Sequence, residues 1–332
     1  MHPLKHTPIS LEQARDALSP IYQHMQASPL LSCQALSQQL DCELYIKHEN
    51  HNPTGSFKIR GGINLMHHLA KTNARGVITF STGNHGLSVA QSAAWFGLPA
   101  TIVVPEGNNP AKNRRIKATG ANLLEAGSSF EHAAQTAERL CNEQGLYYAH
   151  PADEPCLING VASEFLEILE QLPDIDALIL PIGAGSELAA ATLVLKQLKP
   201  EVEIFAVQAE SSPAAYLSWR AGRIQSADNR TFAGGFATGS GYALPFSYYR
   251  ESLSDFVLLS EQEIYQGIAL AAHYTQNLME GAGSASLMAA LRLRERLKGK
   301  KVVVQFSGAN ASASELRHAY QLPCFEHGLN AL

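Results

Sequence analysis

The sequence predicts an α/β protein of two domains, each with a mostly parallel, twisted sheet covered by helices. Short runs of β-branched residues alternate along the chain with amphipathic stretches of helical period. The runs are almost continuously apolar, which is typical of strands buried on both faces. A length of 332 residues, 45% of them hydrophobic, is enough for two lobes with substantial cores.

Each expected element follows from one of these two patterns. The predicted strands cover residues 43–47, 76–81, 100–105, 177–181, 203–209, 255–259 and 301–306. The predicted helices between them cover residues 87–96, 129–144, 187–198, 261–280 and 284–297.

Composition excludes several classes of partner. A formal net charge of -5 argues against nucleic acid or an anionic membrane. The most apolar stretch, residues 176–195, carries Glu187 and so does not read as a membrane span. Residues 1–10 lack the apolar region of a secretory signal. We therefore expect a cytoplasmic protein that acts on a small molecule.

The cysteines and histidines do not suggest a metal centre. Five scattered cysteines without a Cys-x-x-Cys pair are typical of reduced thiols: Cys33, Cys42, Cys141, Cys156 and Cys324. His2 with His6, and His67 with His68, have no acidic or thiol partner at the spacing of a metal site. The sequence predicts no bound metal.

Lys58 is the most informative residue. It follows a Pro-Thr-Gly turn and Phe57, and it opens an apolar run of helical period. The positive end of a helix dipole disfavours a cation, so an amine placed there is suited to act as a neutral nucleophile. The alternative is an ordinary surface lysine after a turn.

Unusual residues also follow three predicted strands. Residues 81–86, 183–186 and 307–310 are rich in glycine and small polar side chains. In parallel sheets, ligands bind beyond the carboxyl ends of the strands. These three segments and Lys58 therefore predict one binding site.

The loop from Gly183 to Leu188 is suited to bind a phosphate. Small residues let backbone N–H groups close on an anion at a helix start, where the dipole adds positive charge. One alternative is a dinucleotide fingerprint that uses Glu210, although its third glycine is replaced by Leu188. A purely structural turn is another.

Two further segments offer polar groups for a substrate or a ring. Residues 81–86 provide N–H donors for a carboxylate and the Asn84 amide; the alternative is a helix start capped by Ser81 or Thr82. Ser307 is either a turn serine or a neutral partner for a heteroaromatic nitrogen. A phosphate loop, an amine, an amide and a hydroxyl together describe a site for pyridoxal phosphate, with the lysine forming a Schiff base.

These motifs resemble the fold-type II pyridoxal-phosphate enzymes, specifically the threonine/serine dehydratase branch that includes serine racemases. The resemblance covers about residues 29–312. It depends on residues 53–58, 81–86, 183–188, 280–283 and 307–310.

The resemblance implies a role for each motif. The cofactor-binding residues would be Phe57, Lys58, Asn84, Gly183, Ala184, Gly185, Ser186, Glu187 and Ser307. The substrate-binding residues would be Ser81, Thr82, Gly83, Asn84 and His85. Lys58 and Thr82 would be catalytic. His85 has no evident partner and is read either as a substrate contact or as a packed side chain.

It also implies an architecture. The fold would be that of the tryptophan synthase β subunit, with a large cofactor-binding domain of residues 1–75 and 153–332. Residues 76–152 would form a small mobile domain. The chain ends 22 residues after Asn310, so we expect no regulatory domain. A homodimer is expected from the resemblance alone.

The implied reaction is elimination of the β-hydroxyl from an L-hydroxyamino acid, which gives a 2-oxo acid and ammonia. Racemisation is the alternative, because Thr82 stands where relatives that racemise have a serine. A non-catalytic protein that holds the cofactor and a β-replacement enzyme are further alternatives.

Three departures from the family pattern bear on these expectations. Phosphate loops of the family are mostly glycine, whereas this one contains Ala184, Ser186 and Glu187, and a carboxylate there is compatible only if it points away. Gly234 stands where an acid is usual, which affects substrate preference. Residues 211–216 contain no acid to complete a cation site with Glu210.

Overall fold

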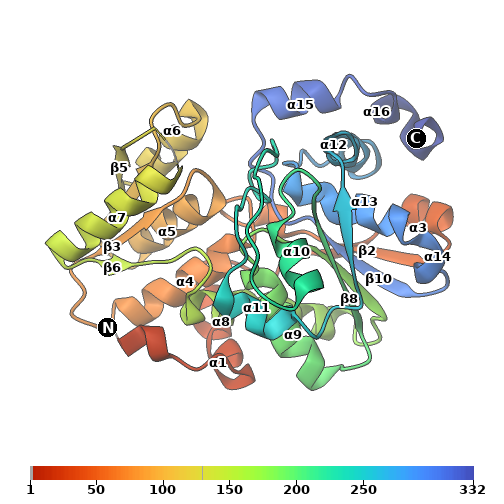
Figure 1. Cartoon of the computed structure of the whole chain (residues 1–332). Helices are drawn as coiled ribbons and strands as arrows, with labels where there is room; N and C mark the ends of the chain where they lie inside the picture. The colour runs from red at the N-terminus through yellow and green to blue at the C-terminus, as the bar shows by residue number, and fades with distance from the viewer. Residues whose placement is uncertain (1–2, 129) are drawn as a thin grey trace. The chain divides into compact units, whose positions relative to one another are not determined.

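The computed structural model describes residues 3–128 and 130–332, which form two compact units (Figure 1). Unit 1 comprises Met1–Gln26 and Phe57–Ser163, and unit 2 comprises Ala27–Ser56 and Glu164–Leu332. His2 and Ser129 lie outside the described residues. The expected small domain of residues 76–152 lies within unit 1, and its mobility stays a prediction.

Unit 1 contains a parallel sheet in the order β5-β4-β3-β6. The strands are β3 (Val77–Phe80), β4 (Ala100–Val104), β5 (Asn122–Glu125) and β6 (Tyr147–Tyr148). The helices are α1 (Leu11–Asp16), α2 (Leu18–Tyr22), α4 (Lys58–Leu69), α5 (Asn84–Trp95), α6 (Pro110–Ala118), α7 (Phe130–Gln144) and the first part of α8 (Pro155–Gln171). A 3-10 turn, η1 (Pro3–His6), precedes them.

Two apolar layers cover the faces of this sheet. On one face Val77 and Ile102 pack with α4 and α5. On the other face Ile78, Phe80 and Val103 pack with α7. All four residues of β3 are buried, so its sequence does not alternate between apolar and polar residues as a half-exposed strand would.

Unit 2 contains a larger sheet in the order β1-β2-β10-β7-β8-β9, parallel except for the edge strand β1. The strands are β1 (Leu30–Ser32), β2 (Glu43–Lys47), β7 (Ala177–Pro181), β8 (Glu203–Ala209), β9 (Asp255–Leu259) and β10 (Lys301–Gln305). In the registers of β10, Val304 is paired with Ile46 of β2 and with Ile179 of β7. The ends of these strands therefore lie side by side.

Helices of unit 2 complete its core. They are α3 (Gln34–Leu40), α9 (Ser186–Leu198), α10 (Ala214–Ala221), α11 (Ala243–Tyr249), α12 (Glu261–Thr275), α13 (Ala285–Arg292), α14 (Arg294–Leu297), α15 (Ala313–Ala319) and α16 (Pro323–His327). Short 3-10 turns are η2 (Glu49–His51), η3 (Ala282–Ser284) and η4 (Gly328–Ala331). Ile179, Phe205 and Val304 lie at 0% exposure in this core.

The predicted α/β class and all the predicted strands are confirmed. Four strands match the predicted bounds, and β3, β4 and β10 differ by one residue at one or both ends. Three short strands were not predicted: β1, β5 and β6. The predicted helix over residues 261–280 is wrong at its end, because Gln276 adopts a left-handed φ of 54° and terminates α12. The predicted helix over residues 284–297 divides at Leu293 into α13 and α14.

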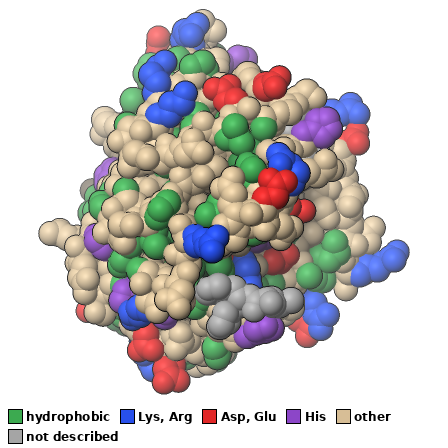
Figure 2. All heavy atoms as spheres, turned by 90° about the vertical axis from the view of Figure 1, so that its left-hand side faces the viewer, with side chains coloured by type: hydrophobic (Ala, Val, Ile, Leu, Met, Phe, Trp, Pro, Cys, Tyr) green, Lys and Arg blue, Asp and Glu red, His purple; other side chains and the backbone are tan. Residues whose placement is uncertain are grey.

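In Figure 2 basic side chains are scattered among acidic and apolar ones on the face drawn. Within residues 3–128 and 130–332, the helices are all too short or too polar to cross a bilayer.

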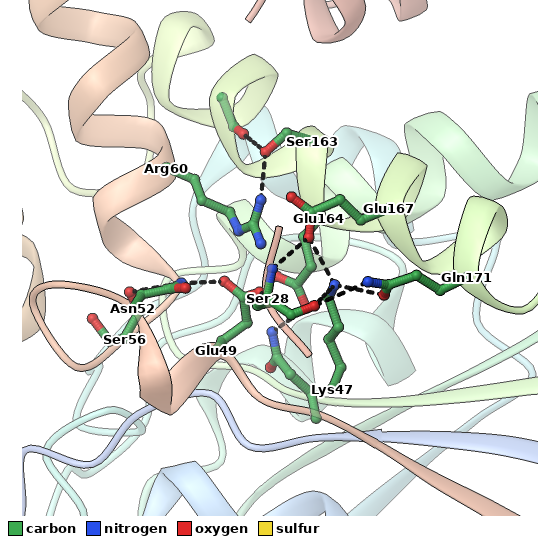
Figure 3. A network of polar contacts seen from close by, with 12 residues as sticks. Ser28, Lys47, Glu49, Asn52, Ser56, Arg60, Ser163, Glu164, Glu167 and Gln171 are labelled. Atoms are coloured by element: carbon green, nitrogen blue, oxygen red, sulfur yellow. Dashed lines mark hydrogen bonds and ion pairs between the residues drawn. The ribbon is translucent and has the colours of Figure 1, made fainter. Parts of the chain in front are cut away.

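A buried polar network fixes the end of β2 in unit 2 (Figure 3). The Lys47 ammonium donates to Glu167 Oε2 at 2.7 Å, to Ser28 O at 2.9 Å and to Gln171 Oε1 at 3.0 Å. Lys47 has 0% exposure, and its three donors match its three acceptors. Glu49 in turn accepts from Asn52, the residue that opens the turn before Lys58.

Removal of the Lys47 charge should destabilise the fold strongly. In Lys47→Met the Glu167 carboxylate stays buried without its ammonium partner, which costs about 3–5 kcal/mol. We expect the free energy of unfolding, measured by urea titration, to fall by that amount. Lys298→Met removes a pair with Asp41 in which both side chains are largely exposed, and it should leave the midpoint unchanged. Equal effects of the two variants would contradict this view of Lys47.

Candidate active site

Lys58 is the first residue of α4, as the sequence predicted. Its ammonium lies 4.7 Å from the centre of the Phe57 ring, and the residue is half-buried. Its carbonyl accepts a hydrogen bond of 2.6 Å from Ser88 Oγ on α5. A Cβ at Gly62 would lie 2.3 Å from the same Ser88 oxygen, so glycine permits the close packing of α4 on α5. The backbone of Lys58 is thereby fixed.

The turn before Lys58 is tied to the end of β10 in unit 2. Gly55 adopts a φ of 72°, which favours glycine, and its carbonyl accepts from the Ala309 N–H at 2.9 Å. Asn310 Nδ2 donates to Thr54 O at 3.0 Å, and Ser56 forms an isolated bridge with Gly308. The two motifs that the sequence analysis singled out, Pro-Thr-Gly-Ser and Ser-Gly-Ala-Asn, therefore pack on each other.

Residues 81–85 follow β3 and begin α5. Thr82, Gly83 and Asn84 are half-buried, whereas Ser81 is buried. The interpretation of Ser81 or Thr82 as a helix cap is wrong: Gly83 is the N-cap, no side chain caps it, and Ser81 Oγ accepts from the Gly83 N–H at 3.2 Å. The side chains of this segment are thus not used to cap α5.

His85 is a packed histidine. Its Nε2 lies 3.0 Å from Thr79 Oγ1 and 3.2 Å from Ala149 O, and its exposure is 6%. Burial, and after it the nearby charge of Lys58, lower the pKa of His85 from 6.5 to about 3. The neutral ring joins β3 to the segment that follows β6. Of the two sequence interpretations of His85, this geometry favours packing.

The glycine loop joins β7 to α9. Gly185 has a φ of 92° and is the N-cap of α9, where no side chain caps the helix. A Cβ at Gly183 would lie 2.0 Å from the carbonyl oxygen of Gly235, so only glycine fits. Ser186 and Glu187 begin the helix and are buried. The turn leaves a helix start lined by backbone, the geometry that anions bind.

Ser307 follows β10 and is 5% exposed. Its N–H donates to Gly283 O at 3.1 Å, and Glu280 N–H donates to Gly308 O at 3.2 Å. A Cβ at Gly283 would lie 2.0 Å from Gly308 O. The Glu-Gly-Ala-Gly motif therefore packs directly against the Ser-Gly motif.

Each unit contains some of the predicted site residues. Unit 2 places the glycine loop and Ser307 at the carboxyl ends of the neighbouring strands β7 and β10. Unit 1 places Lys58 and Asn84 at the starts of two helices that pack on each other.

The Glu187 carboxylate accepts a hydrogen bond from Gln305, the last residue of β10. Gln305 also donates to Glu164 Oε1 at 2.7 Å. Sequence reasoning missed Gln305 and Glu164. For Gln305, a polar residue in the otherwise apolar run of residues 302–306 was the available signal.

Comparison with known proteins identifies the family. A model of the family described as pyridoxal-phosphate dependent enzyme matches residues 21–308. The chain belongs to this family.

Relatives of this pyridoxal-phosphate dependent enzyme match along nearly its whole length. An L-threonine ammonia-lyase of Thermotoga maritima is 34% identical over 304 residues, which cover 91% of this chain and 76% of the relative. The structure of processed threonine deaminase isoform 2 from Solanum lycopersicum superimposes with a TM-score of 0.89 at 30% identity, covering 96% of this chain and 90% of that one. Maize serine racemase superimposes with a TM-score of 0.89 at 26% identity, covering 97% and 99%.

The residues present fit the cofactor of the family, pyridoxal 5'-phosphate. Glycine at positions 183 and 185 lets the loop approach neighbouring segments, because a Cβ would lie 2.0 Å from Gly235 O at the first and 3.0 Å from Pro245 Cβ at the second. The start of α9 carries the positive end of a helix dipole and has no side-chain cap. The Ser307 hydroxyl is a neutral donor and acceptor, as a ring nitrogen requires.

The stability of this pyridoxal-phosphate enzyme should depend on His85 in acid. Its pKa is depressed in the folded state, so the unfolded chain binds the proton more readily. The contribution is fully present above about pH 6.5 and is lost as the pH falls toward about 3. We expect His85→Gln to unfold with a shallower dependence on pH between about 4 and 6, measured by urea titration. The matched control, His327→Gln at an exposed site, should keep the parent slope; a parent-like slope in His85→Gln would contradict the assignment.

Proposed function

We propose that this enzyme removes the β-hydroxyl of an L-hydroxyamino acid of the threonine or serine type and releases a 2-oxo acid and ammonia. The observation that carries the proposal is 34% identity to an L-threonine ammonia-lyase across 91% of the chain. The motifs described above supply a consistent set of groups. Ser307 offers a hydroxyl rather than a carboxylate to the ring nitrogen, which favours prompt loss of a β-leaving group over a long-lived carbanion.

Each residue of the site has a defined task in this proposal. The loop of Gly183, Ala184, Gly185, Ser186 and Glu187 would hold the cofactor phosphate through backbone N–H groups, and Ser307 would be the partner of the pyridine nitrogen. Asn84 would bond the ring hydroxyl, and Phe57 would pack beside the ring. When bound, the cofactor supplies an electron sink that makes the substrate Cα proton acidic.

The chain itself orients the substrate and moves the proton. Backbone N–H groups of residues 81–85 grip the substrate carboxylate at the start of α5, where the helix dipole favours an anion. The Lys58 amine then takes the Cα proton, and positioned acid–base help of this kind contributes about 10²–10⁴-fold. Thr82 lies on the same segment and shields the opposite side with its methyl group.

Assembly and mobility belong to the same proposal. Residues 76–152 form a small domain that closes over the substrate, and two copies of the chain associate as a homodimer. The five cysteines are free thiols, which supports a reducing cytoplasmic location. Size-exclusion chromatography with light scattering tests the dimer.

Racemisation is the second candidate, supported by the 0.89 TM-score to maize serine racemase and by the hydroxyl of the half-buried residue Thr82. Incubation with L-serine and L-threonine separates the two functions. Oxo-acid release supports elimination. Formation of the D-enantiomer without oxo acid supports racemisation and would make it the first candidate in place of elimination.

Lys58→Ala should remove both cofactor attachment and turnover. We expect oxo-acid release from L-threonine to fall by at least about 10²-fold, because the base is lost. Borohydride reduction followed by peptide mass spectrometry should fix the cofactor on the Lys58 peptide in the parent protein only. Lys71→Ala, at an exposed position two residues beyond the end of α4, should retain both properties. A Lys58→Ala protein with parent activity would refute the assignment.

Gly234 should influence which side chain the substrate carries. Gly234 is exposed, and a Cβ there would meet no atom of the described residues within 4 Å, while the next residue, Gly235, packs on Gly183. Gly234→Asp should be folded and should repel an acidic substrate. We expect activity on 3-hydroxyaspartate relative to L-threonine to fall about tenfold or more, a change within the Coulomb energy of two nearby charges. Gly234→Asn, the neutral isostere, should keep the parent ratio; an equal drop in both variants would contradict a charge effect.

A further inference from the structure

Three polar side chains meet inside unit 2, where burial of charge is costly. Glu164 of α8, Glu187 of α9 and Gln305 of β10 are 0%, 3% and 0% exposed. The Gln305 Nε2 group donates to Glu164 Oε1 at 2.7 Å and also to Glu187 Oε1. One amide nitrogen, with two hydrogens, therefore serves two carboxylates. A buried carboxylate is tolerated only when such partners are present.

The positions of Glu187 and Gln305 in the fold connect their contact to the proposed cofactor site. Glu187 is the second residue of α9, immediately after the glycine loop. Gln305 ends β10, two residues before Ser307. The contact therefore links the start of the phosphate-loop helix to the strand that leads to the proposed ring partner.

The charge of Glu187 conflicts with the proposed ligand of the loop. A helix start attracts an anion through its N–H groups and its dipole. A carboxylate in the same first turn interacts with the same positive end and repels a phosphate. The loop can hold a phosphate well only if this carboxylate is kept away from it.

We propose that Gln305 is a positioning residue for the cofactor phosphate: it binds the Glu187 carboxylate against β10 and keeps the N–H groups of the glycine loop available. The inference rests on the proposed assignment of that loop to the phosphate. It makes Gln305 necessary because Glu187 is present, so the two positions should be energetically coupled. Glu164 shares the amide and holds it in place.

The test measures cofactor binding by the apo-protein rather than turnover. Gln305→Leu removes the amide that binds the Glu187 carboxylate against β10, and we expect the dissociation constant for pyridoxal phosphate to rise about tenfold, equivalent to about 1.4 kcal/mol. Binding of pyridoxal, which lacks the phosphate, should stay within about twofold of the parent. The double variant Glu187→Gln with Gln305→Leu removes the charge and should restore the parent constant for pyridoxal phosphate.

Two further variants keep the test decisive. Gln208→Leu removes another glutamine of 0% exposure, on β8, and should leave cofactor binding unchanged. Glu187→Gln alone keeps the loop backbone, removes the repelling charge and should bind pyridoxal phosphate more tightly than the parent, so it tests the charge even if Gln305→Leu does not fold.

Three results would overturn the inference. They are parent-like binding by Gln305→Leu, failure of the double variant to recover binding, and binding by Glu187→Gln alone that is no tighter than that of the parent. A parent protein that binds pyridoxal and pyridoxal phosphate equally would instead refute the assignment of the loop to the phosphate. Urea titration of the apo-proteins is the control for fold stability. We expect Gln305→Leu and the double variant to have similar stability, so that the recovery of binding in the double variant does not reflect a recovery of the fold.

Discussion

Close approach of backbone to backbone at two glycines is the constraint on which the candidate site in unit 2 depends. A Cβ at Gly183 or at Gly283 would lie 2.0 Å from a carbonyl oxygen, on Gly235 or Gly308 respectively. Real Cβ atoms do not approach that closely, so any other residue would force the loops apart. These contacts bring four segments that are far apart in sequence into one layer beyond the carboxyl ends of β7 and β10. The glycine loop and Ser307 are positioned by that layer.

Buried polar groups provide the second level of organisation. The ammonium of Lys47 and the amide of Gln305 each satisfy carboxylates inside unit 2, at the ends of two neighbouring strands. Such groups contribute little net stability compared with apolar residues of similar volume, but removal of one partner is costly. Their effect is to fix the strand ends from which the functional segments leave.

Much of the fold could be predicted from sequence because the decisive signals are local. Val302, Val303 and Val304, or Leu178 and Ile179, form apolar runs that only a buried parallel strand explains well. The strand Tyr147–Tyr148 could not be predicted, since two residues carry no periodic signal and its pairing with β3 comes from tertiary packing. Likewise the end of α12 depends on the left-handed conformation of Gln276. Glycine or asparagine usually occupies such a position, so a glutamine there does not predict a helix end.

The candidate site was predictable where chemistry requires a rare residue and not where it depends on a partner. Lys58, the glycine loop and Ser307 are recognisable from residue type and spacing. The surroundings of His85 and of Glu187 were not, because Thr79, Ala149 and Gln305 become neighbours only in the folded chain. The assignment of Ser81 or Thr82 as a helix cap failed for a related reason: the first turn of α5 starts one residue later than a cap at Thr82 would require, and two later than one at Ser81.

The two units are interleaved along the polypeptide. The chain passes between them after Gln26, after Ser56 and after Ser163, the last time in the middle of α8. Neither unit is therefore encoded by one uninterrupted stretch of sequence. Exchange of a whole unit between homologous genes would need several simultaneous crossovers, and a single crossover would join halves of cores that did not evolve together.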